Sequence, residues 1–183
     1  MNNKLASPGP AGSMVLAFYL GGLFPIFTGL ETSPTGFVIL VALGVGGATV
    51  QLSAGLVSLK KNNILLGNML MAFSAFMWLG SISNFLKLAY PEASINTAVC
   101  DGVVFLVMGI FMIGFTKPFL KMGLFNALFM LATDVFFLTS AFGFMLGVPI
   151  LTVIGGWTCL LVVISIMVNV LREVYAGMKD FAE

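Results

Sequence analysis

The chain has 183 residues, of which hydrophobic residues make up 60% and charged residues 8%, and its formal net charge is +1. This composition indicates an integral membrane protein rather than a soluble domain. The sequence contains no histidine, which excludes a His-dependent catalytic triad, a His metal site and a His proton relay. No loop gathers the basic residues that phosphate binding requires, so no nucleic-acid partner is expected.

Six apolar runs follow one another along the chain. They are Met14–Leu30, Gly36–Leu59, Ile64–Leu86, Thr97–Thr116, Met122–Leu146 and Ile150–Leu171. A helix that rises ~1.5 Å per residue needs roughly 17 to 25 residues to cross the hydrocarbon core. We therefore predict an all-α integral membrane protein with six transmembrane helices in a single domain, residues 1–183. A Pro/Gly-rich segment at 1–13 and a helical tail at 173–183 should lie outside the bilayer.

Positive charges predict the orientation of these helices. If six helices alternate in direction, seven of the eight Lys and Arg residues fall on one side and only Lys87 falls on the other. Positively charged loops stay in the cytoplasm. Both termini should therefore be cytoplasmic, in a multi-pass protein of the plasma (inner) membrane.

The second run is rich in small residues. The sets Gly44/Ala48 and Gly47/Gln51/Gly55 repeat at four-residue spacing, which lets helix backbones approach closely. The amide of Gln51 lies within this strip and must find a partner helix or a water-filled path. We leave both interpretations open: a hydrogen bond between helices, or an amide that lines a pore.

Further polar residues lie inside the later runs. Asn126 and Thr133 fall on nearly the same helix face, with Asp134 one step away, so they are candidates for one aqueous track. An intramembrane carboxylate such as Asp134 indicates function by default, with a structural hydrogen bond as the alternative. Phe73 and its aromatic neighbours are either packing or gate residues.

Few residues suggest catalysis, a metal site or a cofactor. Asp134 has no obvious second intramembrane carboxylate, as an aspartyl protease would need. Cys100 and Cys159 are expected to be buried free thiols rather than a disulfide or a metal pair. We predict no enzyme, no metal and no cofactor.

Several short motifs occur in order along the chain. A segment with Ser7, Pro8, Pro10 and Gly12 lies before the first helix, and it is followed by Gly46-Gly47 with Gln51, Ala54-Gly55-Leu56, Lys60-Lys61, Gly156-Trp157 and Glu173. In this order the motifs resemble the acetate uptake transporter family, which includes the succinate-acetate permeases, and the first segment is similar to that family's N-P-A-P-L-G-L signature. The signature departs from the family at Ser7, Ala11 and Ser13.

This resemblance implies a homohexamer with a pore through each six-helix protomer. It also implies transport of acetate and related small mono- and dicarboxylates, in some members with protons. The family's bulky constriction corresponds to Leu16, Ser74 and Leu131 here. Leu and Ser in place of two aromatics should widen or soften that gate.

Asp134 leaves alternatives open. An ionised carboxylate beside the track would repel an acetate anion, so the group is either neutral and exchanges protons or faces a neighbouring helix. It would also suit a pore for a neutral or cationic solute such as urea or ammonia/ammonium. A membrane scaffold without transport is the third interpretation.

Overall fold

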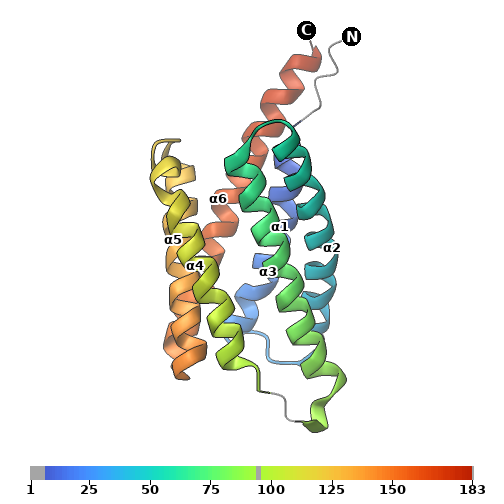
Figure 1. Ribbon diagram of the computed structural model, residues 1–183, viewed down its shortest axis with the longest axis vertical. Coiled ribbons are helices and arrows are strands. Elements are labelled where there is room, and N and C mark those ends of the chain that lie inside the picture. Colours follow the sequence, from blue (N-terminus) through green and yellow to red (C-terminus); the bar gives the residue numbers. More distant parts are fainter. Residues whose placement is uncertain (1–6, 94–95, 183) are drawn as a thin grey trace.

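The computed structural model describes residues 7–93 and 96–182, which form a bundle of long helices (Figure 1). The helices are α1 (Gly9–Phe27), α2 (Pro34–Lys60), α3 (Ile64–Ala89), α4 (Ala98–Leu120), α5 (Leu124–Leu146) and α6 (Pro149–Ala182), with a short 3-10 helix, η1 (Pro91–Ala93), after α3. Each of the six is long and apolar enough to cross a membrane, judged by length and composition. The predicted all-α class and helix number are confirmed.

The helix ends follow local backbone rules. Pro34 stands in the first turn of α2, where its missing N–H costs no helical hydrogen bond. Asn62 turns the chain between α2 and α3 with a positive φ of 58°, and Gly147 ends α5 in the left-handed conformation. These short turns make neighbouring helices antiparallel.

The start of α1 differs from the sequence prediction. The helix begins at Gly9 rather than at Met14, so residues 9–13 of the Pro/Gly-rich segment are helical. Pro8 is the N-cap residue, and its carbonyl O accepts from the backbone N of Gly12 at 3.1 Å. Pro10 is tolerated because it lies in the first turn. At the other end of the chain, α6 continues to Ala182 through the predicted tail.

The six helices form two groups of three. α2 packs closely against both α1 and α3, and α5 packs closely against both α4 and α6. The groups meet along α1 and α6, whereas α3 and α4 make a much looser seam. The start of α1 and the end of α6 lie at one end of the bundle (Figure 1). We call the opposite end, where η1 lies, the distal end.

The small residues of α2 allow close packing inside the protomer. A Cβ atom added at Gly55 would lie 2.7 Å from Met71 Cγ and 3.1 Å from the carbonyl O of Gly67 in α3. One added at Gly44 would lie 3.1 Å from the carbonyl O of Met77. All three distances are too short for ordinary packing, so the predicted close helix contact at this strip is confirmed between α2 and α3.

Candidate solute pathway

A cavity of about 470 Å³ extends from the distal end into the bundle. Its rim carries polar side chains, among them Lys87 and Asp101, and its deep end reaches Tyr19, Phe76 and Phe105. The walls come mainly from α1, α3 and α4, so the cavity follows the loose α3–α4 seam. This shape provides a polar entrance above an apolar interior.

Asp101, in the first turn of α4, organises the rim. Its Oδ2 accepts from Lys87 Nζ at 2.9 Å and from Thr97 Oγ1 at 2.6 Å, while its Oδ1 accepts from Ser83 Oγ at 2.8 Å. The side chains of Lys87 and Asp101 are 35% and 21% exposed. An ion pair of this exposure stabilises the fold by ~1 kcal/mol or less, because solvent screens it. The pair bridges α3 and α4 where those helices otherwise touch little.

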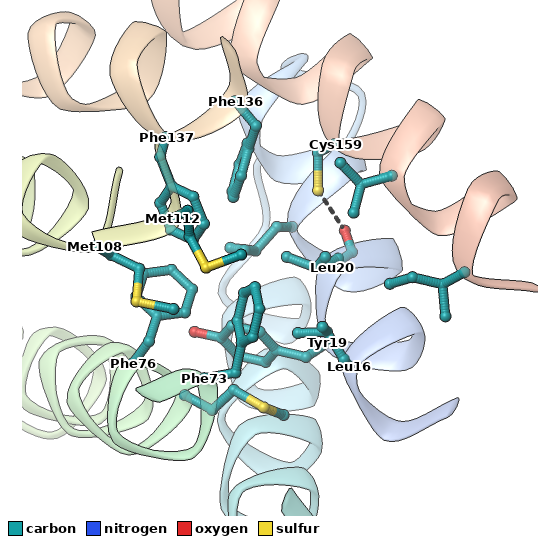
Figure 2. Packing of buried hydrophobic residues seen from close by; sticks show 14 of the residues in the cluster. Leu16, Tyr19, Leu20, Phe73, Phe76, Met108, Met112, Phe136, Phe137 and Cys159 are labelled. Carbon is teal, nitrogen blue, oxygen red and sulfur yellow. Dashed lines mark hydrogen bonds between the residues drawn. The ribbon is translucent and has the colours of Figure 1, made fainter. Parts of the chain in front are cut away.

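An aromatic cluster closes the deep end of the cavity. Phe76 meets Phe105 at a ring-centroid distance of 5.0 Å and Phe137 at 5.1 Å, and it meets Tyr19 at 6.1 Å. These rings come from α1, α3, α4 and α5, and all are buried. Figure 2 shows how Tyr19, Phe76 and Phe137 converge on the centre of the bundle together with Met108 and Met112.

Two of the predicted constriction residues are buried inside the bundle. Leu16 and Ser74 are 3% and 2% exposed, and the Ser74 hydroxyl donates to the carbonyl O of Ala48 at 2.8 Å. Phe73 is fully buried beside them and faces Phe137 at 6.1 Å. Leu16, Phe73 and Phe137 belong to one buried hydrophobic cluster. The wider gate expected at Leu16 and Ser74 stays a prediction.

The structure does not bring Leu131 to this constriction. Its side chain is 49% exposed on the outside of α5, whereas Thr133 is 1% exposed and faces the core. A separation of two residues on a helix corresponds to about 200° of rotation, so the two side chains point to nearly opposite faces. Thr133 is therefore the residue of this pair that is buried in the bundle. Its hydroxyl donates to the carbonyl O of Phe129 at 2.6 Å.

Gln51 makes a hydrogen bond between helices. It is fully buried, and its Nε2 donates to the carbonyl O of Gly12 in α1 at 2.9 Å. Its Oε1 has no hydrogen-bond partner among the described residues. The bond links the predicted signature segment to the small-residue strip of α2. The first of the two open interpretations, a bond between helices, is thus observed.

The three polar residues of α5 bond to different partners, and the predicted aqueous track along them stays a prediction. Asp134 Oδ2 accepts from Thr116 Oγ1 of α4 at 2.7 Å. Asn126 lies nearer the helix start, where its Oδ1 accepts from Asn169 Nδ2 of α6 at 3.0 Å. Thr133 bonds within its own helix. Of the two alternatives for Asp134, the structure has it facing a neighbouring helix, with Oδ1 buried and unpaired among the described residues.

The remaining motif residues lie at the two ends of α1. Gly9 donates from its backbone N to Ser7 Oγ at 3.3 Å, and a Cβ added at Gly9 would lie 3.2 Å from Glu173 Oε2. The Glu173 carboxylate thus lies beside the N-terminus of α1, which favours a negative charge. At the other end, the Trp157 ring packs against Phe24 at 5.2 Å while 55% of the residue is exposed.

The cysteines differ from one another. Cys159 is buried, and its Sγ donates to the carbonyl O of Leu20 at 3.1 Å (Figure 2). Cys100 was expected to be buried but is exposed, because it lies in the first turn of α4 and lines the distal cavity. Both are free thiols. Within residues 7–93 and 96–182, no cluster of three or more His, Cys, Asp or Glu residues could hold a metal ion.

The sequence prediction missed Tyr19 and the Lys87–Asp101 pair as residues that line the distal cavity. A signal for the pair was present, because Lys87 is the lone basic residue on its side and Asp101 follows in the next helix. Two antiparallel helices joined at the distal end bring such residues together. No comparable signal marked Tyr19, whose position depends on helix rotation.

Six helices of membrane-spanning length with a cavity leading to a buried constriction define a multi-pass membrane protein of the channel and transporter class. A solved structure of this class, the bacterial acetate channel SatP, matches with a TM-score of 0.84 and 25% sequence identity. The match covers 96% of this chain and 95% of that one. No protein-family model and no curated protein matches the sequence. The match to SatP supports the resemblance of this chain to the acetate uptake transporter family.

Proposed function

We propose that this protein conducts acetate and related small mono- and dicarboxylates across the plasma membrane. The observation that carries the proposal is the full-length similarity to the bacterial acetate channel SatP. The distal cavity supports it, because a polar rim with one cation leads into an apolar interior that suits the hydrocarbon part of a short carboxylate.

The proposed path starts at the distal rim and passes Tyr19 to the constriction at Leu16, Phe73 and Ser74. From there it continues toward the terminal end of the bundle. Buried rings close this path, so conduction requires the rings to change rotamer or the α3–α4 seam to widen. The seam is suited to such motion because α3 and α4 make few contacts.

The apolar constriction favours passage of the neutral acid. Moving an ionised carboxylate from water to a site among phenylalanine rings has a large unfavourable desolvation free energy, and protonation of the carboxylate removes most of it. Proton-coupled movement therefore needs no dedicated protein carboxyl group, because the solute itself carries the proton. If the protein does supply a carboxyl group that carries the proton, Asp134 is the candidate.

We further propose a homohexamer, as the family resemblance implies. The protomer exposes large apolar side chains on every helix, and these contact either lipid or other protomers. Native mass spectrometry of the purified protein in detergent tests this state. A monomer under conditions that preserve lipid contacts would contradict it.

Uptake of radiolabelled acetate by proteoliposomes tests the proposed function. We expect uptake above protein-free liposomes, faster at the lower of two pH values, with competition by unlabelled succinate. Acetic acid crosses lipid unaided, so the protein-free control is essential. Uptake of methylammonium or urea without acetate uptake would favour the alternative solutes. Uptake of none of these solutes would favour a scaffold without transport.

A further inference from the structure

The Lys87–Asp101 pair at the rim of the distal cavity has a use beyond holding α3 to α4. We propose that it is an exchangeable capture site for the carboxylate group of a small solute, in which the solute replaces Asp101 as the partner of Lys87 Nζ. The inference rests on the proposed function and specifies where and by which atoms a solute is first bound.

Lys87 has the charge, the location and the donors for this role. Among the residues that the structure describes, it is the only Lys or Arg at the distal end, since Lys60, Lys61, Lys117, Lys121 and Arg172 lie toward the opposite end of the bundle. Its ammonium group carries three N–H donors, of which Asp101 uses one. The side chain is 35% exposed and lines the cavity, so a solute reaches it without rearrangement of the backbone.

Asp101 keeps other hydrogen-bond donors when Lys87 turns away from it. When the ammonium group turns to a solute, the Asp101 carboxylate still accepts from Ser83 at 2.8 Å and from Thr97 at 2.6 Å. The exchange therefore leaves no bare buried charge, which would cost several kcal/mol. A lysine without Asp101 would bind anions more tightly, and a pore needs binding that is weak enough to release the solute.

The walls below the pair define the class of ligand. Leu23, Phe27 and Phe105 line the cavity under the rim, so they contact the apolar end of a solute whose carboxylate stays at Lys87. This arrangement fits a short-chain monocarboxylate. A chloride ion has the charge but gains nothing from these walls.

Cys100 offers a direct test, because this exposed thiol lines the same cavity while Cys159 is fully buried. The rate at which Cys100 reacts with an anionic and with a cationic methanethiosulfonate is measured in purified protein, with Cys100→Ser as the labelling control. In the parent, sodium acetate should slow modification more than sodium chloride at equal ionic strength.

Two variants with opposite expected effects sharpen this test. Lys87→Gln should lower the anionic-to-cationic rate ratio by roughly 3- to 10-fold, the size expected for one partly screened charge, and should abolish protection by acetate. Asp101→Asn should raise both the ratio and the protection. Lys121→Gln removes the same charge at the far end and should change neither. Size-exclusion profiles verify that each variant is folded.

The outcomes separate this inference from the proposed function. Acetate protection that persists in Lys87→Gln, or a rate ratio equal to that of the parent, would overturn the capture site even if acetate uptake is normal. Protection that depends on Lys87 supports the capture site even if proteoliposomes take up no acetate. In transporting protein, Lys87→Gln should raise the KM for acetate. Lys87→Arg should bring the KM most of the way back to the parent's value.

Discussion

The Nε2 of Gln51 donates to the carbonyl O of Gly12 at 2.9 Å, and this bond ties α2 to the first turn of α1 in the buried interior. It joins two segments that the sequence resemblance singled out separately. The bond holds the signature segment in place, because the rest of the first turn of α1 carries few side chains that could anchor it.

Replacing Gln51 by Leu should destabilise the protein without abolishing transport. The change removes the donor to Gly12 and also the unpaired Oε1, so part of the loss is offset; we expect a cost of about 1 kcal/mol. The thermal midpoint in detergent measures it, with Leu52→Ala, an exposed neighbour, as the control. Loss of acetate uptake at unchanged thermal stability would instead assign the amide to the pore.

Gly44 and Gly46 form a matched pair on α2. A Cβ at Gly44 would meet Ser81 and the carbonyl O of Met77 at 3.1 Å, whereas one at Gly46 would meet nothing within 4 Å. Gly44→Leu should therefore force α2 and α3 apart and lower the yield of folded protein. Gly46→Leu should leave the folded protomer unchanged. Equal thermal stability of the two variants would contradict the close contact; a weaker oligomer in Gly46→Leu alone would place that face between protomers.

Hydrophobic length predicted the existence and order of all six helices, because crossing hydrocarbon requires continuous apolar runs. Helix rotation was harder to predict. Most of these helices are apolar around their whole circumference, so the sequence does not show which face is buried. Leu131 and Thr133 illustrate the difficulty: both suit a membrane helix, and only the packing of α5 places Thr133 inside. The start of α1 was missed because Pro10 suggested a turn, although a first-turn proline is compatible with a helix.

The aromatic floor of the distal cavity should control which solutes pass. Phe105→Leu removes a ring from the contact with Phe76 and leaves a smaller side chain at the constriction. We expect faster uptake of acetate and a larger relative gain for succinate, at a stability cost of about 1 to 3 kcal/mol. Phe111→Leu is the matched control, because that ring lies on the outer surface of the same helix. Equal changes in both variants would indicate a general effect of packing rather than a gate.

Asp134 and Thr116 provide the last prediction, which concerns proton coupling. In the structure the Thr116 hydroxyl donates to Asp134 Oδ2 at 2.7 Å between α5 and α4, away from the cavity. The side-chain carbonyl O of Asn can accept this bond, so Asp134→Asn should keep the fold, the oligomer and the parent's pH profile of acetate uptake. Asp134→Leu and Thr116→Val should each lower thermal stability by about 1 kcal/mol. The double variant should cost less than the sum of the single variants, because both remove the same bond.

The same experiment decides between the protein and the solute as the proton carrier. An unchanged pH profile in Asp134→Asn means that the proton travels on acetic acid, whose neutral form avoids the desolvation cost of the phenylalanine constriction. A profile that becomes flat, with the oligomer intact, would show that the Asp134 carboxyl group exchanges a proton during transport. Its unpaired Oδ1 would then be the atom to examine, since Thr116 already occupies the other oxygen.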